Sequence, residues 1–246
     1  MSLSYDSGVF LLAIDTCDSR GSIALVGEEV VVATVVHESE APYSSWLFAE
    51  TGKLVKSVGR DMSCIAAYGV ASGPGSFTGL RVGLTAVKAW AEVYERPVIP
   101  VSRLEAVAVQ SRSNSGCVAA FLDAHRGQVF GGLYRREGKE VTPVAQEMVG
   151  SPQEFVTDAL SRSDGGNVRW VSPDANLLAG FPLGPGRTRL EVETACFPLA
   201  PIIGEIAIAR LQKGIVTDAL RLDADYVRRS DAEILWKGPS GGRKLR

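Results

Sequence analysis

The stretch 11-LLAIDTCDSRGSIALV-26 joins an apolar run, an aspartate, a polar turn with a glycine and a second apolar run. A second stretch, 119-AAFLDAHRGQVFGGLY-134, repeats the same order, with Asp123 in the place of Asp15. Apolar runs on either side of a turn that contains glycine indicate paired antiparallel strands. Because the two stretches are separated by nearly half of the 246-residue chain, their match predicts an internal duplication.

The residues that follow each stretch continue the repeat. After the first stretch the sequence predicts a third strand at 30–36, a helix at 45–59, a strand at 64–71, a helix at 80–94 that ends before Pro97, a strand at 98–101 and a helix from Ser102 to about 112. After the second it predicts a strand around 141, a helix at 153–160, a strand at 168–171 and a helix at 201–213. Two copies of β-β-β-α-β-α predict a duplicated α/β fold.

The expected domains follow from this repeat. We expect an N-terminal subdomain at 1–106, a C-terminal subdomain at 107–236 and a flexible basic tail at 237–246. The two subdomains should enclose a cleft, with Asp15 and Asp123 facing it. The tail is interpreted as a solvated terminus, with an RNA-contacting arm as the alternative.

Composition excludes several classes of protein. The formal net charge of −2 argues against a chain that binds nucleic acid by itself, because phosphate neutralisation needs clustered Lys and Arg. The four cysteines form no CxxC pair, so neither a zinc ribbon nor a small disulfide framework is indicated. No apolar run reaches membrane-spanning length, and residues 1–8 do not resemble a signal peptide. We therefore expect a cytoplasmic protein that does not associate with membranes.

The glycine-rich segment 73–79 lies between a predicted strand and a predicted helix. Backbone N–H groups and the helix dipole at such a junction can hold an anion. The segment has no Lys after its last glycine, so it is not a Walker A loop. The alternative is a rigid turn capped by Ser76 or Thr78.

The two strand-end aspartates allow a second hypothesis. Asp15 and Asp123 could position a metal–nucleotide complex from two sides of a cleft, although strand-end aspartates more often cap turns. A vestigial nucleotide or phosphate site would comprise Asp15, Thr16, Gly73, Gly75, Ser76, Gly79 and Asp123. A working site of this kind would make the chain a small actin-like kinase or phosphotransferase that uses Asp15 and the 73–79 loop.

The histidine pattern argues against hydrolytic chemistry. The only two histidines, His37 and His125, are isolated, and there is no HxxxH or HExxH pair and no GxSxG motif. We therefore predict no catalytic residues, no metal and no cofactor. A metallopeptidase would require a bound transition metal.

The helices at 45–59 and 80–94 are unusually apolar. In the second, only a narrow strip with Arg81, Lys88 and Glu92 is polar, so this helix should be buried on more than one side. We predict a subunit interface, the alternative being that the second subdomain covers these helices. The predicted interface comprises Trp46, Leu47, Phe48, Leu54, Arg81, Leu84, Val87, Lys88, Trp90 and Ala91. Val87→Glu should then abolish pairing.

Taken together, these segments resemble a known family. The stretch 11–26, 72-SGPGSFTGLRVGLTAVKAWA-91, 97-PVIPVSRLEAVA-108 and 121-FLDAHRGQVFGGLY-134 resemble, in order and spacing, the bacterial TsaB (YeaZ) proteins. The segment 223–237 resembles that family's C-terminal segment. Tyr43 stands where many members have histidine, and Ala224 stands where proline is usual.

The resemblance implies an actin-like (ASKHA, ribonuclease H-like) fold and a role in forming N6-threonylcarbamoyladenosine in tRNAs that read codons beginning with A. It implies a non-catalytic scaffold that pairs with the metal-bearing paralogue TsaD through its N-terminal helices. The ATPase TsaE would join a larger complex, and contact with tRNA would be indirect. Without TsaD, the same surface would support a homodimer.

Overall fold

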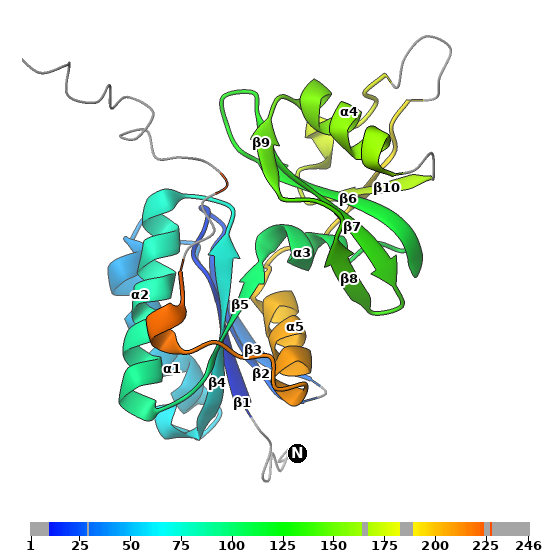
Figure 1. The fold of residues 1–246 in the computed structure, drawn as a ribbon. Coiled ribbons are helices and arrows are strands. Elements are labelled where there is room, and N and C mark those ends of the chain that lie inside the picture. Colours follow the sequence, from blue (N-terminus) through cyan, green and yellow to red (C-terminus); the bar gives the residue numbers. More distant parts are fainter. Residues whose placement is uncertain (1–9, 29, 164–166, 183–188, 224–226, 228–246) are drawn as a thin grey trace, which may run out of the picture.

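The protein contains two mixed β-sheets, one in each half of the molecule and each packed against helices (Figure 1). The computed structural model describes residues 10–28, 30–163, 167–182, 189–223 and 227. The predicted basic tail at 237–246 and Ala224 therefore lie outside the described residues. Within the described part of the chain, every helix is too short or too polar to cross a lipid bilayer.

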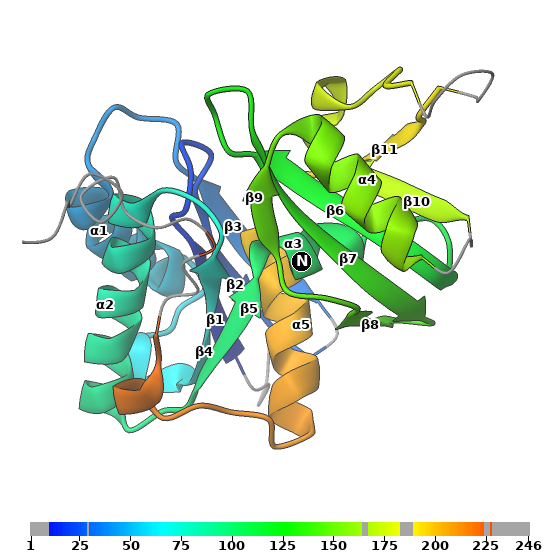
Figure 2. The same ribbon diagram turned by 45° about the horizontal axis from the view of Figure 1, so that its top comes forward.

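The first sheet has the strand order β3-β2-β1-β4-β5. The strands β1, β2 and β3 pair antiparallel in sequence, whereas β4 pairs parallel to β1 and β5 parallel to β4. Helices α1 and α2 cover one face of this sheet, and α5 covers the other (Figures 1 and 2). Its elements are β1 Phe10–Asp15, β2 Ser22–Val26, β3 Val31–Val36, α1 Tyr43–Ser57, η1 Met62–Cys64, β4 Ile65–Gly73, α2 Phe77–Tyr94 and β5 Val98–Ser102.

The second sheet repeats this topology. In the order β8-β7-β6-β10-β11, strand β6 takes the place of β1, β7 of β2, β8 of β3, β10 of β4 and β11 of β5, and each pair keeps its antiparallel or parallel sense. Helix α4 corresponds to α1, while the short helix η2 stands in the place of α2. The additional strand β9 pairs with β7. The predicted duplication is confirmed, and the chain has a duplicated actin-like fold.

The remaining elements complete the second half. They are α3 Arg103–Ala108, β6 Ser115–Asp123, β7 Val129–Glu137, β8 Glu140–Pro143, β9 Met148–Gly150, α4 Pro152–Arg162, β10 Val168–Ser172, η2 Ala175–Leu177, β11 Val192–Thr194, α5 Ala200–Gln212 and η3 Ala219–Arg221.

Helices α3 and α5 cross between the two sheets. Helix α3 leaves the last strand of the first sheet and packs on β6, β7 and β10, whereas α5 leaves the last strand of the second sheet and packs on β1, β2 and β4. A boundary at residue 106 therefore separates the strands of the two sheets. However, this boundary places α5 in the C-terminal half, although α5 covers the first sheet. Each half supplies one covering helix to the other.

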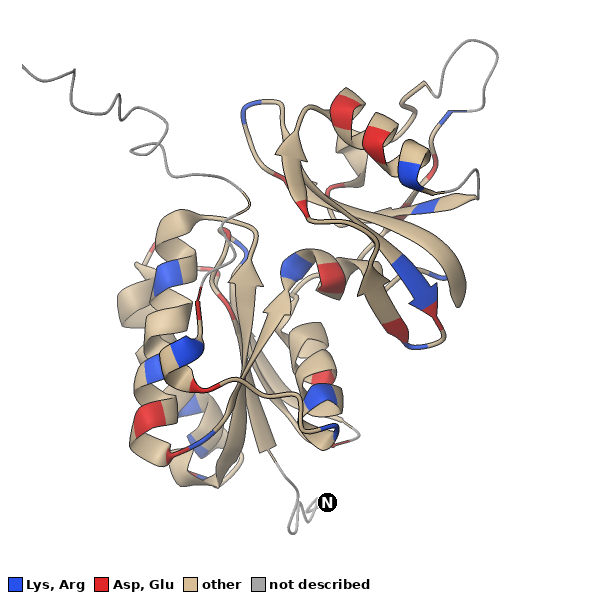
Figure 3. Ribbon diagram, viewed as in Figure 1, with Lys and Arg blue, Asp and Glu red and all other residues tan. Residues whose placement is uncertain are grey.

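The central strands are apolar along almost their whole length. Strand β1 is fully buried, and neither it nor β4 carries a charge until Asp15 ends β1 (Figure 3). Strands that are covered by helices on both faces need apolar residues on both faces, which explains the continuous runs at 10–14 and 65–71. A carboxylate at the end of such a strand is consequently placed at the edge of the core.

Helix α3 is shorter than the sequence predicts. The expected helix to residue 112 ends at Ala108, and the buried Arg136 of β7 donates hydrogen bonds to the carbonyl oxygens of Val109 at 2.5 Å and Ser111 at 3.0 Å. These bonds satisfy carbonyl groups that would otherwise accept from a continued helix. The helix therefore ends where the side chain of Arg136, from the second sheet, supplies hydrogen-bond donors to the backbone carbonyl groups.

Candidate functional site

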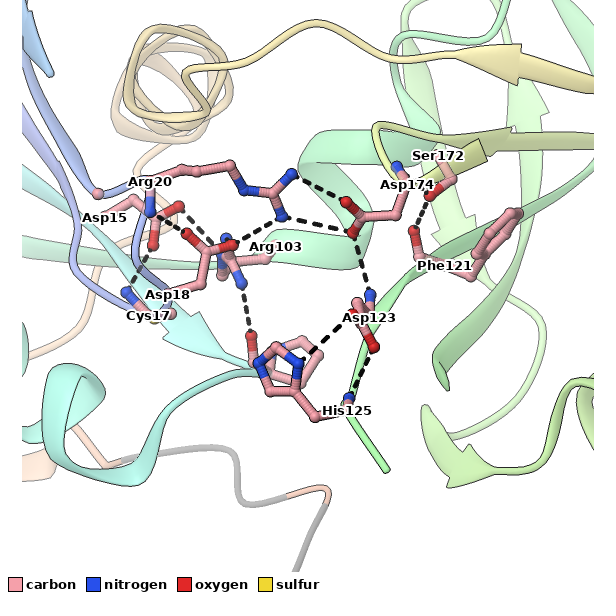
Figure 4. Close-up of polar contacts among 12 residues, drawn as sticks. Asp15, Cys17, Asp18, Arg20, Arg103, Phe121, Asp123, His125, Ser172 and Asp174 are labelled. Carbon is pink, nitrogen blue, oxygen red and sulfur yellow. Dashed lines mark hydrogen bonds and ion pairs between the residues drawn. The ribbon is translucent and has the colours of Figure 1, made fainter. Parts of the chain in front are cut away.

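The carboxylate of Asp15 lies at the junction of the two sheets and is completely buried. Its Oδ1 accepts a hydrogen bond from the backbone N–H of Cys17 at 2.9 Å, and its Oδ2 accepts from Nε of Arg103 at 3.0 Å (Figure 4). Both carboxylate oxygens are thus engaged within the protein. A buried carboxylate held in this way is neutralised without any added cation.

Arg103 supplies the positive charge at this position. It is the first residue of α3, and its side chain is only 2% exposed. Besides Asp15, its guanidinium donates to Oδ2 of Asp18 at 2.6 Å and to the carbonyl oxygen of Pro74 at 3.1 Å. Burial alone would lower the pKa of Arg103, but the carboxylates of Asp15 and Asp18 raise it, so the guanidinium is always charged.

Asp18 links this buried pair to the second sheet. Its Oδ2 also accepts from Arg20 at 3.0 Å, and Arg20 in turn donates to Oδ1 of Asp174 at 2.8 Å. Burial would raise the pKa of Asp18, but Arg103 and then Arg20 hold it below its ordinary value. The result is a continuous chain of alternating charges, Asp15–Arg103–Asp18–Arg20–Asp174, which we call the ion-pair chain (Figure 4).

Asp123 joins the ion-pair chain through its backbone. Its N–H donates to Oδ2 of Asp174 at 3.0 Å, whereas its own carboxylate accepts from the N–H of His125 at 2.7 Å. The latter bond repeats the bond from Cys17 to Asp15 in the other half. Both aspartates therefore form the same turn, but only Asp15 is paired with a buried arginine.

The 73–79 loop packs against the turn that follows Asp15. The N–H of Ser76 donates to the carbonyl oxygen of Cys17 at 2.5 Å, and the hydroxyl of Thr16 donates to the carbonyl oxygen of Gly79 at 2.7 Å. A Cβ atom at Gly75 would lie 2.7 Å from Cβ of Cys17, and one at Gly79 would overlap the carbonyl oxygen of Thr16. The glycines thus allow two segments of backbone to approach each other.

This geometry favours a rigid turn over a phosphate cradle. Ser76 is the N-cap of α2, and its hydroxyl accepts from the N–H of Gly79 at 3.3 Å. Asp15, Thr16, Gly75, Ser76 and Gly79 lie together at the turn after β1, and Asp123 is joined to Asp174 in the second half. The carboxylate of Asp15 is held by Arg103, and the loop is bonded to the turn at 16–17.

Sequence reasoning missed the residues that fill the predicted site. Arg103, Arg20, Asp18 and Asp174 were not among the candidates, although Asp18 and Arg20 belong to the polar turn 16–21. The signal that could have identified Arg103 is the placement of a cation directly after Ser102, a predicted helix cap that ends a buried strand. Asp174 lies two residues beyond β10, the counterpart of β4.

The predicted interface residues on α1 and α2 divide into two groups. Six of the ten are buried in the chain's own core, with at most 8% of each residue exposed: Trp46, Leu47, Leu54, Leu84, Val87 and Ala91. The physical reason is that α2 packs on β4, on α1 and on η3, so the chain itself covers most of its circumference. Val87→Glu would place a charge in this core, which makes it a test of folding and not of pairing.

The exposed surface of α1 and α2 is smaller, and it retains four of the ten predicted residues: Phe48, Arg81, Lys88 and Trp90. Phe48 is 52% exposed and Val93 is 72% exposed, and Arg81 is also exposed. The ring of half-buried Trp90 meets that of Phe48 with centroids 5.1 Å apart. We call Phe48, Arg81, Lys88, Trp90 and Val93 the α1/α2 surface.

Tyr43 connects the α1/α2 helices to the ion-pair chain. Its hydroxyl donates to the carbonyl oxygen of Asp18 at 2.5 Å and accepts from the N–H of Gly21 at 2.8 Å. Burial, with smaller contributions from Asp15 and Asp18, raises the pKa of Tyr43 to about 12. The start of α1 is therefore fixed to the same turn that carries Asp18 and Arg20.

The described residues contain no group of three or more His, Cys, Asp or Glu side chains arranged to hold a metal ion. The prediction that the chain has no metal stays a prediction.

Comparison with known proteins gives a consistent result. A family model described as TsaD, tRNA N6-adenosine threonylcarbamoyltransferase, matches residues 37–174, more than half of the chain. The tRNA threonylcarbamoyladenosine biosynthesis protein TsaB of Bacillus subtilis (strain 168) is 28% identical over 229 residues, covering 92% of this chain and 97% of that protein. TsaB of Escherichia coli (strain K12) is 27% identical over 202 residues, covering 77% and 85% respectively.

A solved structure supports the fold. YeaZ from Pseudomonas aeruginosa matches with a TM-score of 0.70 at 22% sequence identity, covering 89% of this chain and 99% of that chain. At this level of identity the match shows that the two chains share a fold.

Proposed function

The chain belongs to the TsaB (YeaZ) branch of the TsaD family, and from this premise we propose that it serves tRNA N6-threonylcarbamoyladenosine formation as a non-catalytic partner of TsaD. In this proposal TsaD carries the reacting groups, and the present chain binds it and stabilises its active form. TsaE joins the larger complex, and tRNA is contacted through that complex. Without TsaD, the chain forms a homodimer through the same surface.

The observation that carries the non-catalytic role is the state of Asp15. A carboxylate that works on a metal–nucleotide must reach the ligand, but Asp15 is buried with both oxygens bonded to Cys17 and Arg103. The neighbouring 73–79 loop is hydrogen-bonded to the turn at 16–17. This arrangement favours the scaffold over the alternative of a kinase that uses Asp15 and the 73–79 loop.

The α1/α2 surface supports the choice of contact site. It places the exposed ring of Phe48 against Trp90, and exposed Val93 follows Trp90 by three residues on α2. Large apolar side chains surrounded by polar residues are typical of protein contact sites. Because Phe48 rests on Trp90, its ring is already ordered before a partner binds, which reduces the entropy lost on association.

The test combines reconstituted tRNA modification with a direct measurement of association. Phe48→Glu and Val93→Glu change exposed residues and should leave the fold intact, but should weaken the affinity for TsaD by at least about tenfold, the effect of roughly 1.4 kcal/mol. Modification of tRNA by TsaD and the other pathway proteins should fall in parallel. Affinity is measured by titration calorimetry.

Leu177→Glu is the matched control. Leu177 is a partly exposed leucine of η2 in the second half, outside the α1/α2 surface, so this variant should pair with TsaD as the unchanged protein does. Product formation that is equal with and without this chain would refute the scaffold function. Unchanged affinity in Phe48→Glu and Val93→Glu would refute the contact site.

A further inference from the structure

We propose that the ion-pair chain Asp15–Arg103–Asp18–Arg20–Asp174 is an internal latch that fixes the two sheets relative to each other without a bound ligand. The proposal concerns the conformation of this chain alone. It is independent of whether TsaD is the partner.

The inner end of the latch is a cation built into the fold. The guanidinium of Arg103 is surrounded by oxygen atoms, namely the carboxylates of Asp15 and Asp18 and the carbonyl of Pro74, at 2.6–3.1 Å. Carboxylate and carbonyl oxygens are also the ligands that hard divalent cations take. Arg103 satisfies these oxygens from within, so the strand ends and the 73–79 loop are held together without a ligand.

The outer end of the latch crosses between the sheets. Arg20 lies in the turn between β1 and β2, and Asp174 lies between β10 and η2, so their bond at 2.8 Å joins the two halves. Arg20 also rests on the ring of Phe197, with its guanidinium carbon 3.9 Å from the ring centroid. Asp174 is anchored in turn by the N–H of Asp123 and by a bond from its own N–H to Ser172.

Three features make this connection a latch. Each residue in it has at least two partners, so every side chain is held in one orientation. The charges alternate, so each link strengthens its neighbours. The pairs are partly or fully shielded from solvent, so salt weakens them less than it weakens surface pairs.

The experiment measures the distance between the sheets in the full-length chain. Spin labels are placed at Glu205→Cys on α5, which packs on the first sheet, and at Gln153→Cys on α4, which packs on the second, with Cys64 and Cys196 changed to serine. The unaltered latch should give a single narrow distance distribution. Addition of Mg²⁺ and ATP should leave that distribution unchanged.

Two latch variants are then compared with a control. Asp174→Asn keeps an oxygen that can accept from the N–H of Asp123 but removes the charge that Arg20 needs, and Arg20→Ala removes the other partner. Both should broaden or shift the distribution. Arg162→Ala, which breaks an exposed ion pair with Asp158 inside α4, should not.

The outcomes are decisive. A broader distance distribution in both latch variants, with unchanged circular dichroism, supports the latch. The double variant should then show no further broadening, because both substitutions remove the same Arg20–Asp174 ion pair. A narrow, unshifted distribution in folded Asp174→Asn and Arg20→Ala would overturn it. A shift of the unaltered chain on addition of Mg²⁺ and ATP would also overturn it, since the position would then accept a ligand.

Discussion

The hydroxyl of Thr16 donates a 2.7 Å hydrogen bond to the carbonyl oxygen of Gly79, joining residues 63 positions apart in the sequence. The bond fixes the turn after β1 against the first turn of α2. It also explains why residue 79 has no side chain, because a Cβ atom there would overlap the carbonyl oxygen of Thr16. The 73–79 loop is therefore shaped by its fit to the protein's own backbone.

Gly79→Ala should destabilise the chain by about 1–3 kcal/mol or more, because the backbone of the 16–17 turn must move to admit the methyl group. Gly52→Ala is the control, since Gly52 lies within α1 and a Cβ atom there would contact nothing within 4 Å. That change should stabilise α1 by about 0.5–1 kcal/mol. Urea unfolding of both variants measures these differences, and equal effects of the two would contradict the proposed fit.

Arg103→Met should destabilise the chain by about 3–5 kcal/mol, the effect of leaving one partner of a buried ion pair without its counter-charge. Arg162→Ala, which breaks an exposed pair on α4, should change stability by less than about 1 kcal/mol. Thermal unfolding of the two variants and of the unchanged protein measures these differences in stability. If Arg103→Met were as stable as Arg162→Ala, the carboxylates of Asp15 and Asp18 would have to find compensation elsewhere.

The pH dependence of stability should report on Asp18. Because its pKa in the folded protein lies below the ordinary value of 3.8, the unfolded chain binds the proton first as the pH falls. The stabilisation from Asp18 is therefore complete well above pH 3.8 and is lost as the pH falls through the folded pKa. Asp18→Asn should flatten this part of the profile.

The measurement for Asp18 is the urea midpoint at several pH values from about 6 to 3.5, a window that brackets the titration of an unfolded carboxylate. Glu205→Gln, which changes an exposed carboxylate on α5, should leave the profile unaltered. A profile for Asp18→Asn that is parallel to that of the unchanged protein would rule out the assignment.

Thiol reactivity should separate the four cysteines. Burial, followed by the charge of Asp15, raises the pKa of the Cys17 thiol, so little reactive thiolate forms there. Exposed Cys196 and half-buried Cys64 should react with a disulfide reagent in the folded protein, whereas Cys17 and Cys117 should react only after unfolding. Mass spectrometry after brief labelling identifies the modified residues, and early modification of Cys17 would show that the 73–79 loop opens readily.

The repeat could be predicted from the sequence because it is visible in short segments of neighbouring residues. Apolar runs that end in Asp15 and Asp123 specify buried strands followed by turns, and the structure has both. The helices at 43–57 and 77–94 were expected within a few residues. Short elements such as β9 and β11 were missed, since three residues carry too little periodicity.

The polar junction could not be predicted in the same way. The partner of Asp15 is Arg103, 88 positions away, and the partner of Arg20 is Asp174, 154 positions away. Each pairing depends on how α3 and the β10–η2 turn are placed by the whole fold. The burial of Val87 was misjudged for a similar reason, because the cover of α2 depends on how β4, α1 and η3 pack around it in the whole fold.

The exchange of α3 and α5 has a consequence for how the chain acquires its structure during synthesis. The first sheet leaves the ribosome early, but one of its faces stays bare until α5, which ends at Gln212, has been made. Contacts between residues so far apart in sequence form slowly, and apolar strands that wait for their cover are prone to aggregate. We expect a nascent chain that stops near residue 110 to bind chaperones, and the protein to mature as one cooperative unit only when nearly all of it has been translated.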